Sequence, residues 1–275
     1  MEEQEKLISE LTNELNNVLE FWNKHTIDEI NGGFVGETDS LGKKVYEADK
    51  GVVLNTRILW SFSAAYNFNG DPKWLDLAHR AFHYLMSRFK DPRNGGLYWA
   101  VNAAGNVIND RKQVYGQGFG IYALSEYFKA TGSRKALEEA IELFDLLDKY
   151  SYDPVNGGYL EALAADWTRM GDVRLSLKDA NSPKSMNTHL HVLEPFSNLY
   201  RVWPADILRN RIQSLIRVFL DRIIDQRTGH FHLFFGEDWE VQSNMVSYGH
   251  DIEGAWLINE AAELIQDRDL ITESR

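Results

Sequence analysis

The sequence contains no cysteine among its 275 residues, which excludes disulfide bonds, thiolate metal sites and a cysteine nucleophile. Basic residues are also few. The 29 lysines and arginines face 41 aspartates and glutamates and form no cluster, so nucleic acid is not an expected partner. No apolar run reaches the roughly 18 residues that a membrane-spanning helix needs, so we expect no membrane contact. The N-terminus is acidic and lacks the basic start and apolar core of a signal peptide, so we expect a cytoplasmic location.

The sequence is rich in apolar residues and in repetition. Hydrophobic residues make up 44% of the chain, which is enough for a large core. The tetrapeptide NGGF at 31–34 recurs as NGGL at 94–97, as NGGY at 156–159 and, more weakly, as TGHF at 228–231. The first glycines of the four copies lie 63, 62 and 72 residues apart, and such a period is typical of a repeat architecture. Asn-Gly and Gly-Gly tolerate positive φ and therefore predict turns.

Between these turns, apolar residues recur with helical spacing. The expected helices cover 7–22, 52–68, 74–85, 115–128, 136–150, 207–224 and 248–265. Alternate helices begin near Gly51, Gln113, Lys184 and Tyr248. They carry most of the unusual polar residues, which favours an inner ring of helices around a common space. We therefore predict an all-α fold, a single incomplete (α/α)6 toroid domain over 1–275, with the turns together at one end. An open helical solenoid is the alternative.

Two candidate site residues lie in the first two inner helices. Arg57 falls within an otherwise apolar stretch, where an arginine needs an anionic partner or water. It therefore belongs either to a buried ion pair or to a functional site. Tyr115 can donate its hydroxyl to a ligand or simply pack.

The most polar helical segment is SMNTHLHVLEP. Asn187 and His191 are four residues apart and share a helix face, and Glu194 lies next to His191. His189 and His191 point roughly apart, which argues against a metal pair, and no other metal-ligand pattern is present. Pro195 has no N–H to offer the His191 carbonyl, which predicts a kink beside the polar face.

A second polar segment, SYGHDIEGAW, begins the last inner helix. His250 lies near the positive helix end, whose field disfavours imidazolium and keeps the ring neutral, ready to act as a base. Glu253 lies three residues further on and is positioned to hold the orientation of the His250 ring. A histidine that merely packs in the core is the alternative.

These segments resemble the N-acylglucosamine 2-epimerase superfamily, and most closely the cellobiose 2-epimerases. The strings SMNTHLHVLE and SYGHDIE are the most specific matches. Further matches, in the family's order, are NGGFVGETD, ADKGVVLNTRILWSFSAAY, NGGLYWAV and RKQVYGQGFGIYALSEYFKATG, and the likeness extends to about Ala262. The resemblance implies an (α/α)6 barrel with its site at one mouth, no metal, no redox cofactor, and a reducing mono- or disaccharide as substrate.

The resemblance also implies roles for individual residues. Its catalytic positions fall on His250, His191, Arg57 and Glu253. Its substrate-binding positions fall on Tyr115, Asn187, Asp179 and Trp99, the last two by motif placement alone. His250 matches one of the family's two acid/base histidines, His191 the residue that assists ring opening and polarises the sugar carbonyl, and Arg57 the arginine that stabilises the enediolate.

Part of the family pattern has no counterpart in the sequence. The 275 residues hold about four of the six units of such a closed repeat architecture, so we expect a truncated chain. The second acid/base histidine is expected in the absent C-terminal third. We therefore expect the chain alone to be inactive and to self-associate through the open flanks of its toroid.

The residue types favour proton transfer over two alternatives. The C2 proton of an aldose is only weakly acidic, so the charge of the enediolate must be stabilised as it forms, which suits the permanent charge of Arg57. An inverting glycoside hydrolase would need two separated carboxylates, for which the sequence offers Glu161, Asp166, Asp251 and Glu253. A non-catalytic carbohydrate-binding remnant is the other alternative. For an epimerase we expect one shared cavity, lined by Asn55, Arg57, Tyr115, His191 and His250.

Overall fold

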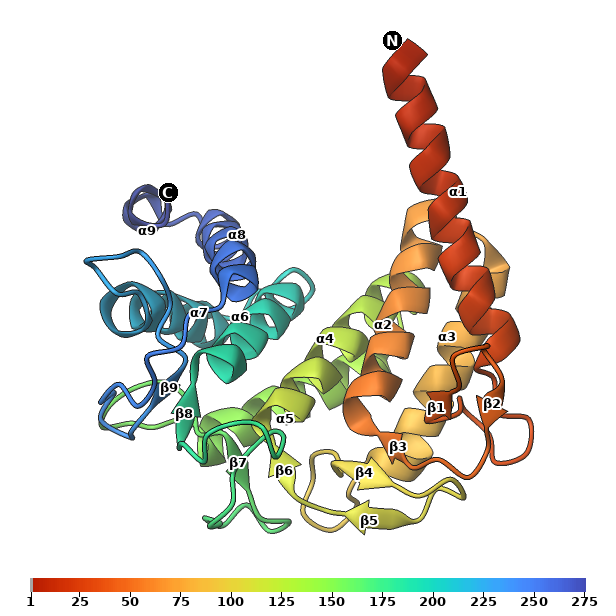
Figure 1. Cartoon of the computed structure of the whole chain (residues 1–275), viewed down its shortest axis with the longest axis horizontal. Helices are drawn as coiled ribbons and strands as arrows, with labels where there is room; N and C mark the ends of the chain where they lie inside the picture. Colours follow the sequence, from red (N-terminus) through yellow and green to blue (C-terminus); the bar gives the residue numbers. More distant parts are fainter. Residues whose placement is uncertain (1) are drawn as a thin grey trace.

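The computed structural model describes residues 2–275, in which helix pairs follow one another and curve into an arc (Figure 1). The inner layer consists of α2 (Val52–Asn69), α4 (Val114–Thr131), α6 (Met186–Tyr200) and α8 (Tyr248–Leu264). The outer layer consists of α3 (Pro72–Tyr84), α5 (Arg134–Tyr150), α7 (Asp206–Val218) and the short α9 (Arg268–Glu273). Each inner helix packs against the next inner helix and against its outer partner. The predicted two-layered all-α toroid is thus confirmed over the described part of the chain.

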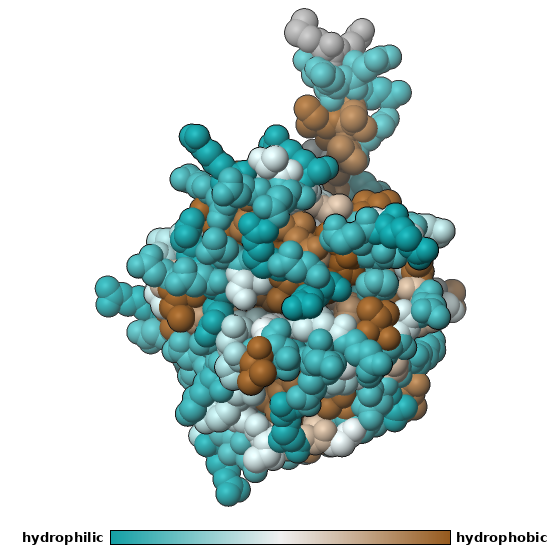
Figure 2. Space-filling view, turned by 90° about the vertical axis from the view of Figure 1, so that its left-hand side faces the viewer, coloured by the Kyte–Doolittle hydropathy of each residue, from teal (hydrophilic) through white to brown (hydrophobic). Residues whose placement is uncertain are grey.

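The outer helices α3 and α7 each end in a π-helical turn, Leu85–Phe89 (η1) and Phe219–Ile223 (η2). After each π-helical turn the chain becomes extended, at Lys90 and at Ile224. Lys90 forms a β-bridge with Leu97, and Ile224 forms one with Phe231, the last residue of the glycine turn in each unit. The first helix, α1 (Glu2–His25), projects beyond the arc, and Figure 2 shows apolar side chains on its projecting part.

Within residues 2–275, nine short strands lie at one end of the helix pairs (Figure 1). They are β1 (Glu37–Thr38), β2 (Lys44–Val45), β3 (Lys50–Gly51), β4 (Ala100–Val101), β5 (Val107–Asn109), β6 (Lys112–Gln113), β7 (Ala162–Leu163), β8 (Lys184–Ser185) and β9 (Phe234–Phe235). All pairs are antiparallel, in the orders β1-β2, β3-β4-β5, β6-β7 and β8-β9. The strand before each of the inner helices α2, α4 and α6 therefore pairs with a strand of the following unit, which locks neighbouring units together.

The four glycine turns form one repeated structure, as their sequences predict. Each turn is closed by an antiparallel bridge, and the pairs are Ile27–Phe34, Lys90–Leu97, Tyr152–Tyr159 and Ile224–Phe231. In three units the fourth residue of the inner helix accepts the backbone N–H of the last turn residue. These contacts are Leu97 N–H to Gln117 at 2.7 Å, Tyr159 N–H to His189 at 2.8 Å and Phe231 N–H to Asp251 at 2.9 Å. The inner helices are thus positioned by side chains of different types at one repeat position.

Buried ion pairs anchor the first three turns to the strands that precede the inner helices. They join Asp28 to Lys50 at 2.7 Å, Asp91 to Lys112 at 2.8 Å and Asp153 to Lys184 at 2.8 Å. Each aspartate also accepts two backbone N–H groups of its own turn, so the buried charge is fully hydrogen-bonded. In the fourth unit Val246 stands two residues before the helix, where the lysine stands in the others.

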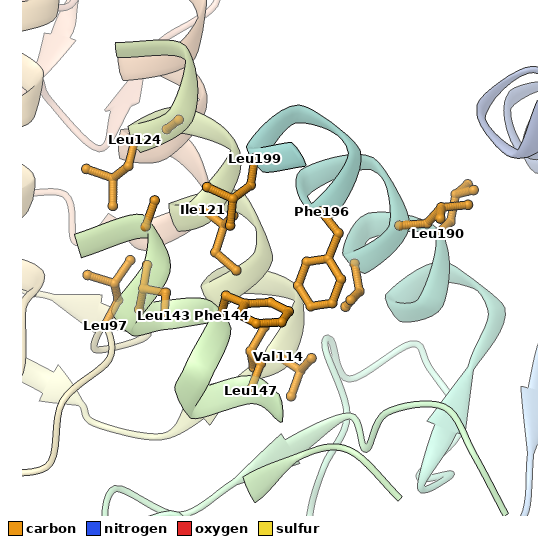
Figure 3. Packing of buried hydrophobic residues seen from close by; sticks show 14 of the residues in the cluster. Leu97, Val114, Ile121, Leu124, Leu143, Phe144, Leu147, Leu190, Phe196 and Leu199 are labelled. Atoms are coloured by element: carbon orange, nitrogen blue, oxygen red, sulfur yellow. The ribbon is translucent and has the colours of Figure 1, made fainter. Parts of the chain in front are cut away.

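The core lies between the two layers of helices. Figure 3 shows Ile121 and Leu124 of α4 packing with Leu143 and Phe144 of α5, and Phe196 of α6 reaching the same cluster. Phe144 and Phe196 meet edge to face, with ring centroids 5.1 Å apart. Across residues 2–275, no helix has the combined length and apolarity needed to cross a bilayer.

Candidate active site

Two cavities are each lined in part by residues of α6 and α8. The larger, about 260 Å³, is lined by Arg57, Trp60, Ser61, Phe119, Tyr122, His191, Glu194 and Glu253. The smaller, about 160 Å³, includes Glu161, Asp179, Asn187 and His250 in its lining. Asn187 and His191 are one turn apart on α6, and His250 and Glu253 are one turn apart on α8, so the cavities lie one helical turn from each other. The expectation of one shared cavity was wrong in this respect, because Arg57 and His191 line the larger cavity, His250 lines the smaller one, and Asn55 and Tyr115 line neither.

Arg57 contributes a cation that has no carboxylate partner among residues 2–275. Its Nη2 donates to the Tyr115 hydroxyl at 3.2 Å, and its guanidinium carbon lies 4.5 Å from the centre of the Phe119 ring. The side chain is exposed to the cavity, so the alternative of a buried ion pair is wrong. Burial raises the pKa of Tyr115, so its hydroxyl keeps its proton and can donate it to a ligand.

The His191 ring is held between aromatic rings and carboxylates. Its centroid lies 5.0 Å from that of Tyr115 and 5.2 Å from that of Phe119. Its Nδ1 lies 3.2 Å from Glu194 Oε2, as the helical spacing predicts. Its Nε2 lies 4.0 Å from Glu253 Oε1, so a carboxylate flanks each ring nitrogen.

The predicted kink in α6 is present at His191, which has φ −86° and ψ 17° inside the helix. Pro195 leaves the His191 carbonyl without a helical donor. That carbonyl points at α4, where Gly118 makes room for it, because a Cβ on Gly118 would overlap the carbonyl oxygen. The kink and the glycine together set the angle at which His191 meets Tyr115 and Phe119.

His250 occupies the third position of α8 and lines the smaller cavity with Asn187 and Asp179. Its Nδ1 is buried and has no hydrogen-bond partner among the described residues. The expectation that Glu253 orients this ring was wrong, because the Glu253 carboxylate is directed toward His191 instead. Asp179 accepts the Ser176 N–H at 2.8 Å, which holds its loop at the cavity.

Asn55, Trp99 and Tyr115 are not among the residues that line either cavity. Asn55, which we expected to face the site, is buried and donates to the Gly51 carbonyl at 2.9 Å. Trp99 packs against Gly116 of α4 and is not among the residues that line either cavity. Its place in substrate binding stays a prediction.

His189, the neighbour of His191 on α6, is a structural residue. Its Nε2 accepts the Tyr159 N–H at 2.8 Å, and its Nδ1 lies 2.6 Å from the Ser185 carbonyl. Both ring nitrogens are therefore occupied. Burial lowers the pKa of His189 to about 4, so the ring is neutral near pH 7.

Glu161 is the site residue that the sequence indicated least clearly. The sequence suggested it only as one of four carboxylates for a hydrolase. In the structure it is buried, lines the smaller cavity and leaves Oε1 without a partner among residues 2–275. The available signal was its repeat position, two residues after the NGGY turn.

Comparison with known proteins identifies the family. The family model described as N-acylglucosamine 2-epimerase (GlcNAc 2-epimerase) matches residues 32–275 of the chain. The chain belongs to the N-acylglucosamine 2-epimerase family. Cellobiose 2-epimerase of Bacteroides fragilis is 45% identical over 93% of the chain and 65% of its own length. Cellobiose 2-epimerase of Dictyoglomus turgidum is 36% identical over 97% and 68%.

Solved structures of the family agree with this fold. That of cellobiose 2-epimerase from Spirochaeta thermophila superposes with a TM-score of 0.90 at 35% identity, over 98% of this chain and 68% of that one. The chain thus spans about two thirds of the length of these 2-epimerase relatives. All candidate site residues fall within the region that matches the family.

Proposed function

We propose that the chain carries one side of a sugar 2-epimerase site, which moves the C2 proton of a reducing mono- or disaccharide such as cellobiose. The observation that carries this proposal is the Arg57 guanidinium, which faces a cavity with His191 and Glu253 and lacks a carboxylate partner among residues 2–275. A cation without a counter-ion, fixed by Tyr115 and Phe119, suits a reaction in which negative charge develops on the substrate.

The chemistry follows from how weakly acidic the C2 proton is. Removing it leaves an enediolate, whose oxygens accept hydrogen bonds and carry negative charge. Arg57 offers planar donors and a permanent charge for these oxygens, and the Tyr115 hydroxyl adds a further donor. Because these groups are fixed by Phe119 and by one another before any charge forms, little reorganisation opposes the step.

The two histidines take separate roles in this proposal. His250 removes or returns the C2 proton, for which a histidine is suited near neutral pH. His191 assists ring opening and polarises the C1 carbonyl, with Glu194 and Glu253 beside its two nitrogens to hold the ring and balance a positive charge. Asn187, one turn before His191 and on the wall of the smaller cavity, is placed to hold a hydroxyl of the same ring.

Epimerisation also needs a proton on the opposite face of C2. His189 is excluded from this task, because both of its nitrogens are occupied inside the protein. We propose that the second acid/base group belongs to the part of the relatives' length that these 275 residues do not span. The 275-residue chain by itself is therefore expected not to interconvert the epimers.

The structure offers less to a glycoside hydrolase. Of the four carboxylates suggested by the sequence, Asp251 accepts from the Phe231 N–H and contacts His230, and Asp166 is exposed and accepts from Thr168. Only Glu161 and Glu253 line cavities, and these are different cavities. No two of these four carboxylates therefore line the same cavity, as a hydrolase would require of them. Glu194 and Glu253 do share the larger cavity, but both flank the His191 ring.

Product analysis tests the proposal. The extended protein, which we define as residues 1–275 followed by the remaining C-terminal third of the Bacteroides fragilis relative, is incubated with cellobiose. An epimerase converts cellobiose into the disaccharide with mannose at its reducing end and releases no monosaccharide. Release of glucose would show a hydrolase, and binding of cellobiose without conversion would show a binding protein. Either result would contradict the proposal.

A further inference from the structure

Glu161 stands at a position that recurs in three units. It follows the last turn residue by two, as do Trp99 and Leu233 in the units before and after. The carbonyl at this position accepts the N–H of the first residue of an inner helix. The pairs are Val52 to Trp99 at 3.0 Å, Val114 to Glu161 at 2.9 Å and Met186 to Leu233 at 2.9 Å. Because the other two units carry apolar side chains here, the junction itself does not require a carboxyl group.

The Glu161 side chain is costly where it lies. It is buried, and only Oε2 has a defined partner, the Thr188 hydroxyl, which donates at 2.7 Å. Ser185 lies beside the carboxyl, but Oε1 has no hydrogen-bond partner among residues 2–275. Burial raises the pKa of Glu161 to about 7, although Ser185 and Thr188 partly offset that effect. A buried oxygen without a hydrogen-bond partner destabilises the folded state, so a functional role is needed to explain its presence.

The unpaired oxygen belongs to a residue that lines the smaller cavity, together with a second group of the same kind. His250 Nδ1 is also buried and without a partner among the described residues. Asn187 and Asp179 line the same cavity of about 160 Å³. The cavity thus combines two unsatisfied polar atoms with an amide and a second carboxyl, a pattern that suits a ligand rich in hydroxyl groups.

This inference rests on the proposed function. We propose that Glu161 is a sugar-binding residue whose Oε1 hydrogen-bonds a hydroxyl group of the ring held beside His250. Thr188 fixes the other oxygen, and the Glu161 backbone is held on both sides, by Val114 N–H and by the Pro183 carbonyl. The carboxyl is therefore oriented before the sugar arrives, which lowers the entropy cost of the contact.

Two variants separate sugar binding from folding. Glu161→Gln keeps the shape and the hydrogen-bonding capacity of the side chain. The double variant Glu161→Leu/Thr188→Val removes both partners of the internal bond, so neither is left unpaired. Leucine already occupies the equivalent position, Leu233, in the next unit, so the junction accommodates it.

Cellobiose binding to the 275-residue chain is measured by saturation-transfer NMR titration, which detects weak complexes, and folding by circular dichroism. The dissociation constant of the Glu161→Gln variant for cellobiose is expected to lie within about threefold of the wild-type value. The double variant is expected to bind cellobiose about tenfold more weakly, which corresponds to about 1.4 kcal/mol and is a typical loss for one hydrogen bond. Unchanged affinity in a folded double variant would overturn the inference alone. A wild-type chain that binds no sugar would overturn both this inference and the proposed function.

A second measurement does not depend on the folding of the double variant. Infrared difference spectra near pH 6 should contain a protonated carboxyl band that is lost in Glu161→Gln. Cellobiose is expected to shift that band in the wild type, because Oε1 gains a hydrogen bond. A band that does not respond while cellobiose binds would overturn the assignment of Glu161.

Discussion

His189 Nε2 accepts the backbone N–H of Tyr159 at 2.8 Å, so this histidine joins a glycine turn to an inner helix. Gln117 makes the equivalent contact with the Leu97 N–H at 2.7 Å in the preceding unit. The two side chains occupy the same repeat position, although one is titratable and the other is not. Gln117 therefore shows that a glutamine can make the contact that His189 makes.

His189→Gln is expected to fold and to keep the activity of the extended protein, because glutamine supplies the same acceptor. It should also change the response to acid. Burial holds the pKa of His189 at about 4 in the folded state, below its ordinary value of 6.5. Below pH 6.5 the histidine is protonated in the unfolded chain but stays neutral in the folded one. The free energy of unfolding of the wild type therefore falls by up to about 3 kcal/mol between pH 6.5 and 4.

Chemical denaturation at several pH values measures this difference. The variant should lose less stability than the wild type over the same interval, and the two should run parallel above pH 7. Loss of epimerisation in a well-folded His189→Gln protein would mean that His189 transfers a proton after all.

Glu161→Gln is expected to change stability in the opposite pH direction. Burial raises the pKa of Glu161 to about 7 from an ordinary 4.5, so the folded state keeps a proton that the unfolded chain releases. This contribution to stability is complete below pH 4.5 and is lost as the pH rises through 7, by up to about 3 kcal/mol. The melting temperature of the variant, relative to that of the wild type, should therefore rise between pH 5 and pH 8. Glu240→Gln, at an exposed carboxylate, is the control and should show no such gain.

Gly118→Ala tests the contact between α4 and the kink of α6. The added Cβ would overlap the backbone carbonyl oxygen of His191, which cannot move aside as a flexible side chain could. We therefore expect the free energy of unfolding to fall by about 1–3 kcal/mol. Gly249→Ala is the matched control, because no atom lies within 4 Å of a Cβ at that helical position. It should leave stability unchanged or raise it by up to about 1 kcal/mol. Equal melting temperatures for the two variants would contradict the close approach.

We propose that the 275-residue chain self-associates through apolar residues at the two ends of the arc. On α8, Tyr248, Ile252 and Trp256 recur every four residues and are 72%, 76% and 61% exposed. On α1, the exposed apolar residues are Leu7, Ile8, Leu11, Val18 and Phe21. Figure 2 shows apolar surface on the projecting helix. Contiguous exposed apolar surface of this kind usually drives association.

Ile252→Glu/Trp256→Glu should shift the chain toward monomer in sedimentation velocity experiments. Val155→Glu is the control, because Val155 is even more exposed, at 86%, but lies on a loop rather than in such a stripe. A wild-type chain that sediments as a monomer at high concentration would contradict this proposal.

The sequence predicted the repeat, the helices and the kink at His191, because turn glycines, helical periodicity and a proline act locally. It did not predict that the Glu253 carboxylate lies beside His191 of α6. Spacing along α8 places Glu253 beside His250, but packing of α8 against α6 brings its carboxylate toward His191. The division into two cavities and the unpaired oxygen of Glu161 likewise depend on how separate units meet, which spacing along one helix does not determine.

The proposed role of His250 is tested most directly by isotope exchange. The extended protein is incubated with cellobiose in D2O, and incorporation of deuterium at C2 is followed by NMR and mass spectrometry. We predict that the wild type incorporates deuterium at C2 and that His250→Ala abolishes this exchange while the circular dichroism spectrum stays unchanged. Exchange at the wild-type rate in a folded His250→Ala protein would contradict the account and remove His250 from the proton transfer.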